Sequence, residues 1–545
     1  MTREKRYITT PIYYVNDKPH IGHVYTTTLC DVYARWMRFA GREVFFLTGT
    51  DEHAAKVVDA AAERGLSPQD WADQNAKVFQ EVFGLLKLTN DDFIRTSEAR
   101  HTERVTRYVA ELLDSGDVYL GEYEGWYDAG QEEYIPENRA KELDFTSPFN
   151  GKPLVRKKEE NFFFRLSKYA EPLLDLLERG ESFRVEPVSR RNEIINRIKD
   201  GLNDVPISRT GSTDWGIMVP GNEEHTIYVW IDALFNYLST VDDEGRRHFW
   251  PADVHVTAKD ILWFHAVIWP AMLLALQNRP GYEWAKLPKL LYFHSFWIAE
   301  GRKMSKSLGN FIDLDTINRY LDTYGLDALR YYLVTQGPLG ATDADFASDH
   351  FHNVYHTDLV NTVGNCASRV SAMINKYFDG VIPELSTADR SRVIADHNWP
   401  EWTAQAVQAA GDSTEAFELD DAIAQGIALI RKVDGFINTT EPFKIAKDES
   451  KRDELAVILY QCAETVRIAS LLLGPVLPIK MAELWDAYGQ TIDPAKGDLT
   501  DLAAWGGLQP GTPIRKVALF PRVENPVEII TSDDQSAPNQ PQEQP

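Results

Sequence analysis

Two histidines near the start of the chain, His20 and His23, have a spacing that could bind phosphate. They enclose Ile-Gly and stand directly before the run Val24–Phe39, in which apolar side chains recur at helical spacing. His23 is therefore expected at a helix start, where unpaired backbone N–H groups and a partial positive charge attract phosphate. The imidazoles add hydrogen-bond donors, and the glycine lets a ligand approach the backbone. The alternative is that both are ordinary loop histidines.

Two lysines past the middle of the chain, Lys303 and Lys306, could act on the same kind of ligand. They stand three residues apart in Lys-Met-Ser-Lys-Ser, which Gly301 and the pair Gly309-Asn310 frame. The glycines and hydroxyl residues are typical of a mobile loop, and two ammonium groups make it a clamp for anions. The alternative is a solvated basic loop.

A carboxylate, Asp51, follows the apolar run Glu43–Thr48, which predicts a buried strand. Ligands of open α/β sheets bind at the carboxyl ends of the strands, so this carboxylate could hold a substrate ammonium. The alternative is that Asp51 caps a helix.

Alternating strands and helices must position these groups. Further strands are expected at Tyr7–Thr10, Thr226–Trp230, Val254–Thr257 and Leu290–Phe293. The stretch 116–224 is dense in Gly, Pro and charged residues, and it predicts an insertion between two halves of one sheet domain. From residue 351 the chain is expected to be almost wholly helical, and residues 526–545 have the composition of a disordered tail.

Composition limits the class of protein. A chain of 545 residues should form several domains, and a net charge of −25 argues against binding nucleic acid by bulk charge. There is no secretory leader pattern and no apolar run that we expect to span a bilayer. The three cysteines, Cys30, Cys366 and Cys462, stand far apart, which indicates a reducing, cytoplasmic setting without disulfides.

The two motifs belong to a wider pattern that covers about residues 6–525. It includes Thr-Pro-Ile-Tyr-Tyr-Val-Asn at 10–16, Leu-Thr-Gly-Thr-Asp-Glu-His at 47–53, Tyr-Val-Trp-Ile-Asp-Ala at 228–233, Lys-Asp-Ile-Leu-Trp-Phe-His at 259–265 and Asn-Cys-Ala-Ser-Arg at 365–369. With His-Ile-Gly-His and Lys-Met-Ser-Lys-Ser in this order, the chain resembles the class I aminoacyl-tRNA synthetases. Among them it is most similar to the methionine-specific family.

The resemblance implies an α/β fold with a split Rossmann-type parallel-sheet catalytic domain, an inserted connective domain and a C-terminal α-helical bundle that binds the anticodon. The expected divisions are 1–115 (first sheet half), 116–224 (connective insertion), 225–285 (second sheet half), 286–350 (lysine loop and linking domain), 351–525 (helical anticodon-binding domain) and 526–545 (disordered acidic tail).

The implied reaction is attack of the methionine carboxylate on the α-phosphate of ATP, followed by transfer of methionine to the 3′ end of its tRNA. The resemblance implies that His20, His23, Lys303 and Lys306 are catalytic, with Mg²⁺ accompanying ATP. The residues that it implies bind ATP are His20, Gly22, His23, Asp260 and Lys306. Positioning and stabilisation of charge on phosphate oxygens supply most of such catalysis. Ala258 replaces the family's usual glycine, which adds a methyl group near the expected ribose site.

The resemblance also implies a pocket for the methionine side chain, with Asp51 binding its α-ammonium group. The implied lining residues are Ile12, Tyr14, Trp230, Ala233, Tyr237, Ile261 and His265. A thioether is apolar and polarisable, and it packs well against aromatic edges. Plain core packing is the alternative for these aromatic residues.

Three residues of the helical region are implied to read the CAU anticodon of methionine tRNA. Asn365 and Arg369 would bind base edges, and Phe443, which follows Pro442, would stack on a base. Many relatives have Trp at this last position. The alternative for Phe443 is a core residue of the bundle.

The insertion departs from relatives that carry cysteine-based zinc knuckles. Asp128, Gln131, Ser147 and Asn150 stand where the two cysteine pairs would fall, and such a set makes a poor tetrahedral zinc site. We predict an insertion without structural zinc, so metal analysis of the purified protein should find none in stoichiometric amount. One equivalent of tightly bound zinc would contradict this prediction.

Other classes of function fit the sequence less well. The cysteine-specific synthetase would need a thiolate-binding zinc, and nucleotidylyltransferases are far shorter and do not explain the lysine loop. A non-catalytic tRNA-binding protein would not need all four catalytic residues. We expect a monomer, because no appended oligonucleotide-fold domain follows Phe520.

Overall fold

A parallel sheet carries the predicted motifs in a computed structural model, which describes residues 3–128, 133–135, 137–148, 150–210, 215–305 and 309–529. Its strand order is β2-β3-β1-β13-β14-β8, and β4 also pairs with β3. Each of these pairs is parallel. The strands are β1 (Lys5–Thr9), β2 (Tyr13–Tyr14), β3 (Glu43–Asp51), β4 (Asp92–Arg95), β8 (Arg184–Glu186), β13 (Val254–Ala258) and β14 (Leu290–His294).

The two faces of the sheet bury different apolar side chains. Ile8 and Phe46 belong to a core that also includes α1 and continues into the helical region. Tyr7, Phe45 and Leu47 alternate with them and belong to a second core that includes α4 and α10. The helices of this part are α1 (Ile21–Phe39), α2 (Ala55–Ala62), α3 (Pro68–Leu85), α4 (Ala99–Asp114), α8 (Val229–Leu234), α9 (Asn236–Ser239) and α10 (Trp269–Gln277), with shorter turns η2 (Arg247–Phe249), η3 (Lys259–Ile261) and η4 (Phe264–Ile268).

Strand β1 is the point at which the strand order changes direction. The chain continues from β1 through β2 and α1 to β3 on one side, and β13 and β14 occupy the other side. In open α/β sheets, ligands bind outside the carboxyl ends of the strands at such a point. The first turn of α1, which follows β1 and β2 along the chain, therefore stands where the fold favours a ligand.

The predicted insertion builds sheets of its own. One has the strand order β6-β5-β7-β9, and a smaller one has the order β10-β12-β11. Its elements are β5 (Val118–Asp128), β6 (Glu133–Ile135), α5 (Glu137–Glu142), β7 (Val155–Phe164), η1 (Leu166–Tyr169), α6 (Ala170–Arg179), α7 (Val188–Lys199), β9 (Val205–Pro206), β10 (Ser208–Thr210), β11 (Met218–Val219) and β12 (Asn222–Ile227). Within the same stretch, β8 returns to the main sheet and pairs with β14.

The strand expected at Thr226–Trp230 is wrong in its second half. β12 ends at Ile227 and pairs only within the small sheet, whereas Trp230 lies in the first turn of helix α8. The backbone explains the change, because the Tyr228 carbonyl accepts hydrogen bonds from the N–H groups of Ile231 (2.9 Å) and Asp232 (3.2 Å).

A linking region joins the sheet to the helical domain. It contains β15 (Trp297–Ala299), α11 (Leu314–Tyr324), α12 (Leu326–Gln336) and β16 (Ala344–Phe346). A buried ion pair crosses the junction: Arg330 of α12 binds Asp31 of α1 at 2.7 Å and donates to the Pro475 carbonyl at 3.0 Å. Burial would raise the pKa of Asp31, but Arg330 and Arg35 outweigh it and lower the value to about 2, so the carboxylate stays ionised.

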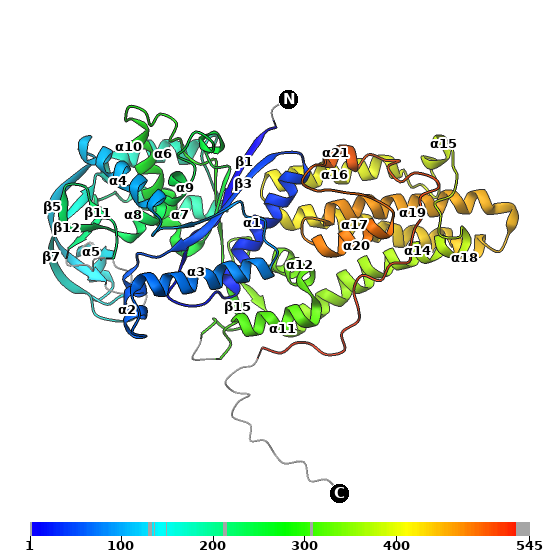
Figure 1. Ribbon diagram of the computed structural model, residues 1–545, viewed down its shortest axis with the longest axis horizontal. Coiled ribbons are helices and arrows are strands. Elements are labelled where there is room, and N and C mark those ends of the chain that lie inside the picture. The colour runs from blue at the N-terminus through cyan, green and yellow to red at the C-terminus, as the bar shows by residue number, and fades with distance from the viewer. Residues whose placement is uncertain are drawn as a thin grey trace, which may run out of the picture.

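The remaining region is helical, as expected, and it occupies the other half of the molecule (Figure 1). Its elements are α13 (Ser348–Val354), η6 (Tyr355–Gly364), α14 (Asn365–Tyr377), α15 (Thr387–Arg390), α16 (Trp399–Glu415), α17 (Leu419–Thr440), α18 (Pro442–Ile445), η7 (Glu449–Lys451), α19 (Arg452–Leu473), α20 (Pro478–Ala487) and α21 (Leu499–Leu502). The expectation that no apolar run could span a bilayer needs correction. Glu449–Leu473 is long and apolar enough to cross a membrane, but its most apolar stretch is wholly buried, as in a core helix.

The first residues of the predicted tail lie against the linking region. The Tyr320 hydroxyl donates to the Val527 carbonyl at 2.8 Å, and the Ile529 N–H donates to the Ser348 hydroxyl at 3.1 Å. Residues 530–545 lie outside the described part of the chain.

Candidate functional site

The two histidines of the first motif form a reciprocal cap on helix α1. His20 is the N-cap residue, and its Nδ1 accepts a hydrogen bond from the Gly22 N–H at 3.0 Å. The Nδ1 of His23 accepts one from the His20 N–H at 3.1 Å. A capping box usually uses Ser or Thr with Glu or Gln, and imidazoles take both positions here. Because each Nδ1 accepts, each neutral ring carries its proton on Nε2. Both histidines therefore belong to the start of a helix and not to a loop.

His23 is held in the neutral form. Burial, followed by the charge of His20, lowers the pKa of His23 well below its usual value of 6.5. The rings of Tyr13 and Phe79 pack edge-on against it, with centroids at 4.7 and 5.4 Å. At neutral pH, His23 therefore offers a neutral Nε2–H donor.

Gly22 is required by the histidine that precedes it. A Cβ atom on Gly22 would lie 2.9 Å from Cε1 of His20, closer than real Cβ contacts. Any side chain at this position would push the His20 ring out of its capping position. The glycine therefore serves the imidazole as well as any ligand that approaches the backbone.

The segment after the lysine loop contacts the histidine turn. The Ile21 N–H donates to the Ile312 carbonyl at 3.1 Å, and the ring of Phe311 meets the His20 ring edge-on at 5.1 Å. Lys303 is exposed at the start of the loop, whereas Lys306 lies outside the described residues. The stem of the lysine loop and the start of α1 are therefore adjacent, although they are far apart in the sequence.

A buried amide, Asn310, fixes the stem of this loop, a role that was not predicted from the sequence. Its Nδ2 donates to the carbonyl groups of Ala299 (3.1 Å) and Lys303 (3.3 Å), and its Oδ1 accepts from the Ser305 N–H at 2.9 Å. The only available signal was a small polar residue directly after Gly309.

Asp51 is the last residue of β3 and is buried with 3% of its surface exposed. Helix α2 begins four residues later and has Ala54 as its N-cap, so the alternative that Asp51 caps a helix is wrong. Tyr14 of β2 is its register partner across the sheet. This places a carboxylate at the carboxyl edge of the sheet, beside an aromatic residue.

Aromatic rings from three elements meet next to this edge. The Trp230 ring of α8 meets the Tyr14 ring edge-on at 6.3 Å and stacks on Phe264 at 4.0 Å with an interplanar angle of 9°. Phe264 was missed in the sequence, although it directly precedes His265 in a motif that was identified. The side chain of Ile12 is half-buried and packs against the same core.

Two further residues implied to line the pocket, Tyr237 and His265, are joined by a hydrogen bond. The Tyr237 hydroxyl donates to Nε2 of His265 at 2.8 Å, because Nδ1 of His265 donates to the Ile261 carbonyl at 3.1 Å. Burial lowers the pKa of His265 to about 4, so the ring is neutral. Ala233 is buried, and Asp260 is exposed just after β13.

The three residues implied to read an anticodon lie in the helical domain. Asn365 is exposed at the start of α14, and Arg369 binds Asp434 at 3.0 Å and Asn438 at 3.4 Å on α17. Phe443 has 44% of its surface exposed, so the alternative of a core residue is wrong.

The zinc-knuckle region is packed by aromatic side chains. Trp126 and Phe145 have ring centroids 4.5 Å apart and cover a small apolar core. Asp128 and Ser147 are buried there and Asn150 is exposed, whereas Gln131 lies outside the described residues. Among the residues that the structure describes, no group of three or more His, Cys, Asp or Glu side chains could hold a metal.

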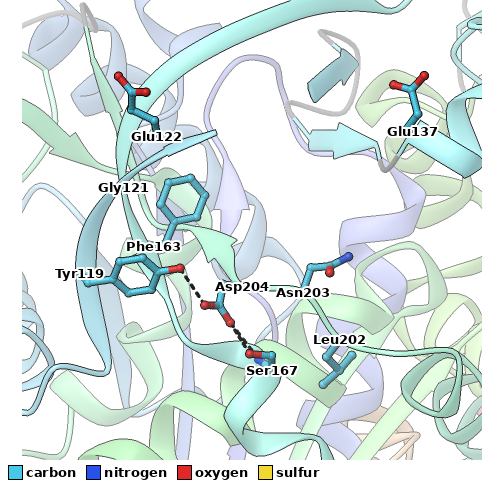
Figure 2. A pocket seen from close by; sticks show the side chains of 9 residues that line it. All are labelled: Tyr119, Gly121, Glu122, Glu137, Phe163, Ser167, Leu202, Asn203 and Asp204. Atoms are coloured by element: carbon cyan, nitrogen blue, oxygen red, sulfur yellow. Dashed lines mark hydrogen bonds between the residues drawn. The ribbon is translucent and has the colours of Figure 1, made fainter. Parts of the chain in front are cut away.

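A separate pocket lies in the insertion (Figure 2). Tyr119 and Phe163 form one wall, and Asp204 accepts hydrogen bonds from Tyr119 Oη at 2.8 Å and Ser167 Oγ at 2.6 Å. Its lining residues are Tyr119, Gly121, Glu122, Glu137, Phe163, Ser167, Leu202, Asn203 and Asp204. Its polar residues were not singled out from the sequence, and three carboxylates make this pocket unfavourable for a nucleotide phosphate.

The chain matches one family model over most of the sheet-bearing region and the start of the helical domain. The model described as tRNA synthetases class I (M) matches residues 6–143 and 143–371. The methionine–tRNA ligase of Listeria monocytogenes (strain F2365) is 41% identical, over 97% of this chain and 79% of that protein. That of Streptomyces coelicolor is also 41% identical, over 95% of this chain and 96% of that protein.

Solved structures give the same result. The Mycobacterium tuberculosis methionyl-tRNA synthetase in complex with methionyl-adenylate superposes with a TM-score of 0.84 at 35% identity, covering 95% of this chain and 100% of that one. The apo form of the Mycobacterium tuberculosis enzyme gives a TM-score of 0.79 at 31% identity, covering 96% of this chain and 99% of that one.

Proposed function

This chain belongs to the methionyl-tRNA synthetase family of class I synthetases, and from that premise we propose how its residues carry out the reaction. It is a methionine–tRNA ligase, which uses ATP to activate methionine and then charges tRNA with it. The contact between the start of α1 and the stem of the lysine loop carries the residue assignment. Methionine-dependent exchange of labelled pyrophosphate into ATP is the experiment that tests this function.

We propose that the first step is direct phosphoryl chemistry on ATP, without a covalent enzyme intermediate. A carboxylate oxygen of methionine attacks the α-phosphorus, the bond to the bridging oxygen breaks, and pyrophosphate leaves with that electron pair. In the second step, a 3′-terminal hydroxyl of tRNA attacks the carbonyl carbon of the adenylate, and AMP leaves. In the first step the enzyme must align the reactants and stabilise negative charge on phosphate oxygens.

His20 and His23 are the proposed donors to the α-phosphate. Their Nδ1 atoms are occupied by backbone N–H groups, which supports an Nε2–H on each ring that can donate to a phosphate oxygen. The α1 N-terminus adds its partial positive charge. A neutral imidazole suits this role, because it donates a hydrogen bond without requiring protonation at physiological pH.

Lys303 and Lys306 are proposed to neutralise the departing pyrophosphate, together with the Mg²⁺ ion that accompanies ATP. Lysine acts on phosphate as a point charge on a flexible stem, which suits a group that must follow a leaving ion. The Asn310 hydrogen bonds support a defined stem from which the loop can reach the histidine turn. We propose Asp260 as the partner of the ATP ribose, because it follows the carboxyl end of β13.

The proposed methionine pocket lies between the carboxyl edge of β3 and helix α8. Asp51 would bind the α-ammonium group, and its burial supports a strong charge-assisted contact. The thioether would pack among the proposed lining residues, which are Ile12, Tyr14, Trp230, Ala233, Tyr237, Ile261 and His265. The stacked pair of Trp230 and Phe264 supports an apolar, polarisable wall for sulfur.

Asn365, Arg369 and Phe443 are proposed to read the CAU anticodon. Arg369 is held by Asp434 and Asn438 on α17, the helix that leads directly into α18, which carries Phe443. An exposed aromatic ring, an exposed amide and a guanidinium group held on α17, all in the helical domain, fit the recognition of unstacked bases. This arrangement is local, so it does not require a positively charged surface over the whole domain.

Replacing Phe443 should weaken tRNA charging and leave methionine activation unchanged. Base–aromatic stacking contributes about 1–3 kcal/mol, so Phe443→Leu should raise the tRNA KM by about 5- to 150-fold. Phe443→Trp keeps a π face and should stay within about threefold of the parent. Aminoacylation at varied tRNA concentration measures both variants, with pyrophosphate exchange as the control. An unchanged tRNA KM in the leucine variant would contradict the proposed role.

We infer a cytoplasmic enzyme without structural zinc. The three cysteines are free and buried, which is consistent with a reducing compartment. The packing of Trp126 on Phe145 supports an insertion held by apolar contacts. The monomeric state stays a prediction.

A further inference from the structure

A buried carboxylate outside the proposed reaction site, Asp232, is bound by two histidines from distant parts of the chain. Its Oδ2 accepts from Nδ1 of His53 at 2.7 Å, and its Oδ1 accepts from Nε2 of His101 at 2.7 Å. The side chains of Asp232, His53 and His101 are 1%, 8% and 0% exposed, respectively. We call these three residues the Asp232 clamp.

The clamp holds an ionised carboxylate. Burial would raise the pKa of Asp232, but the adjacent His53 and His101 outweigh it and lower the value to about 2. A carboxylate has no proton to give, so both imidazoles must be the donors. Nδ1 of His101 also lies 2.8 Å from the Ser239 hydroxyl, which extends the network to α9.

The members of the clamp come from three parts of the chain, two of which carry proposed pocket residues, while the third, α4, packs against α9, which carries Tyr237. His53 is two residues beyond Asp51, at the end of β3. Asp232 lies on α8 between Trp230 and Ala233, while His101 projects from α4. Helix α8 has only six residues and no side-chain cap, so its position depends on tertiary contacts of this kind.

We propose that Asp232 is a positioning residue for methionine binding, which fixes α8 against the end of β3. In this arrangement the clamp sets the separation between the carboxylate that binds the ammonium group and the aromatic wall that packs on the thioether. The inference rests on the methionine pocket of the proposed function. A misplacement of about 1 Å in such a site is enough to cost binding and rate.

Asp117 in the insertion is a matched control. It is 4% exposed and accepts from Lys168 (2.6 Å), Tyr169 (3.0 Å) and Ser115 (2.9 Å), so it resembles Asp232 in being a buried carboxylate that accepts hydrogen bonds from side chains. None of its partners lies on an element that carries a proposed pocket residue. If Asp232 were only structural, replacing either carboxylate should have the same kind of effect.

The first experiment compares Asp232→Asn with Asp117→Asn by pyrophosphate exchange. Because a hydrogen bond to a charged group is removed, Asp232→Asn should raise the methionine KM by about tenfold or more, with the ATP KM unchanged within about twofold. Asp117→Asn should change neither value. An unchanged methionine KM in Asp232→Asn, or an equal rise of both KM values, would overturn the proposal.

A second pair of variants changes His53, the least buried residue of the Asp232 clamp. His53→Asn keeps an N–H group close to the position of Nδ1, so it should hold the Asp232 carboxylate and stay within about threefold of the parent methionine KM. His53→Leu has no donor and should raise that KM by about tenfold or more. Equal methionine KM values in the two variants would overturn the proposal even if Asp232→Asn did not fold.

Trp230→Ala separates failure of this inference from failure of the pocket itself. A methionine KM that rises in Trp230→Ala, Asp232→Asn and His53→Leu supports both. A rise in Trp230→Ala alone would overturn the clamp and leave the pocket intact. If the methionine KM did not rise in Trp230→Ala, both the proposed pocket and the positioning role of Asp232 would be wrong.

Discussion

His23→Asn is expected to lower the rate constant of methionyl-adenylate formation by about 10²–10³-fold, the usual effect of removing one donor to developing charge. The substitution removes the Nε2–H group that we assign to the α-phosphate. Its Oδ1 can still accept from the His20 N–H, so α1 should keep its cap. Rapid-quench measurement of adenylate formation tests the rate, and equilibrium binding should show an unchanged methionine Kd.

His23→Gln is the matched control for this variant, because its Nε2 lies close to the position of the imidazole Nε2. It should retain more activity than the asparagine variant, while both should have the thermal stability of the parent. Adenylate formation at the parent rate in His23→Asn would contradict the donor role. Loss of the folded state in His23→Asn alone would show that the histidine serves mainly as a cap.

Lys306→Ala is expected to have an effect of similar size, about 10²–10³-fold on the rate of adenylate formation. Removing the ammonium group leaves charge on the departing pyrophosphate uncompensated, whereas methionine has no contact with it and should bind as before. Single-turnover kinetics at saturating methionine and ATP measure the rate. Lys286→Ala, which removes an exposed lysine outside the motif, is the control and should behave as the parent. Pyrophosphate exchange at the parent rate in Lys306→Ala would contradict the role.

Much of the sheet was predictable because its strands are buried on both faces and appear as continuous apolar runs. The runs Glu43–Thr48, Val254–Thr257 and Leu290–Phe293 are confirmed as parts of β3, β13 and β14. The helical periodicity after His23 is likewise confirmed as α1. These signals are local, because each depends only on neighbouring side chains and on the period of burial.

Elements whose conformation is set by distant partners were not predictable. The β-branched and aromatic residues of Thr226–Trp230 favour a strand locally, yet α8 begins at Val229 and is held through Asp232 by two histidines far away in the sequence. Strand β8 has three residues, too few for a periodic signal, and it is identified only by its pairing with β14.

In the candidate site, too, local sequence signals identified some features, whereas contacts between distant residues were visible only in the folded chain. Residue types and spacing identified His20 and His23, but not that each ring accepts a backbone N–H and so carries its proton on Nε2. The roles of Asn310 and Phe264 were missed, because an amide and an aromatic residue are common and only their contacts mark them. The contact of Phe311 with His20 likewise required the folded chain.

The most direct test of the account is pyrophosphate exchange into ATP by the purified chain, measured with each of the twenty amino acids in turn. The account predicts exchange that requires methionine and ATP together, proceeds without tRNA, and is far slower with every other amino acid. Exchange that is fastest with a different amino acid, or no exchange with any of them, would contradict the account. Its central claim is that the histidine turn and the lysine loop act together on one ATP molecule to activate methionine.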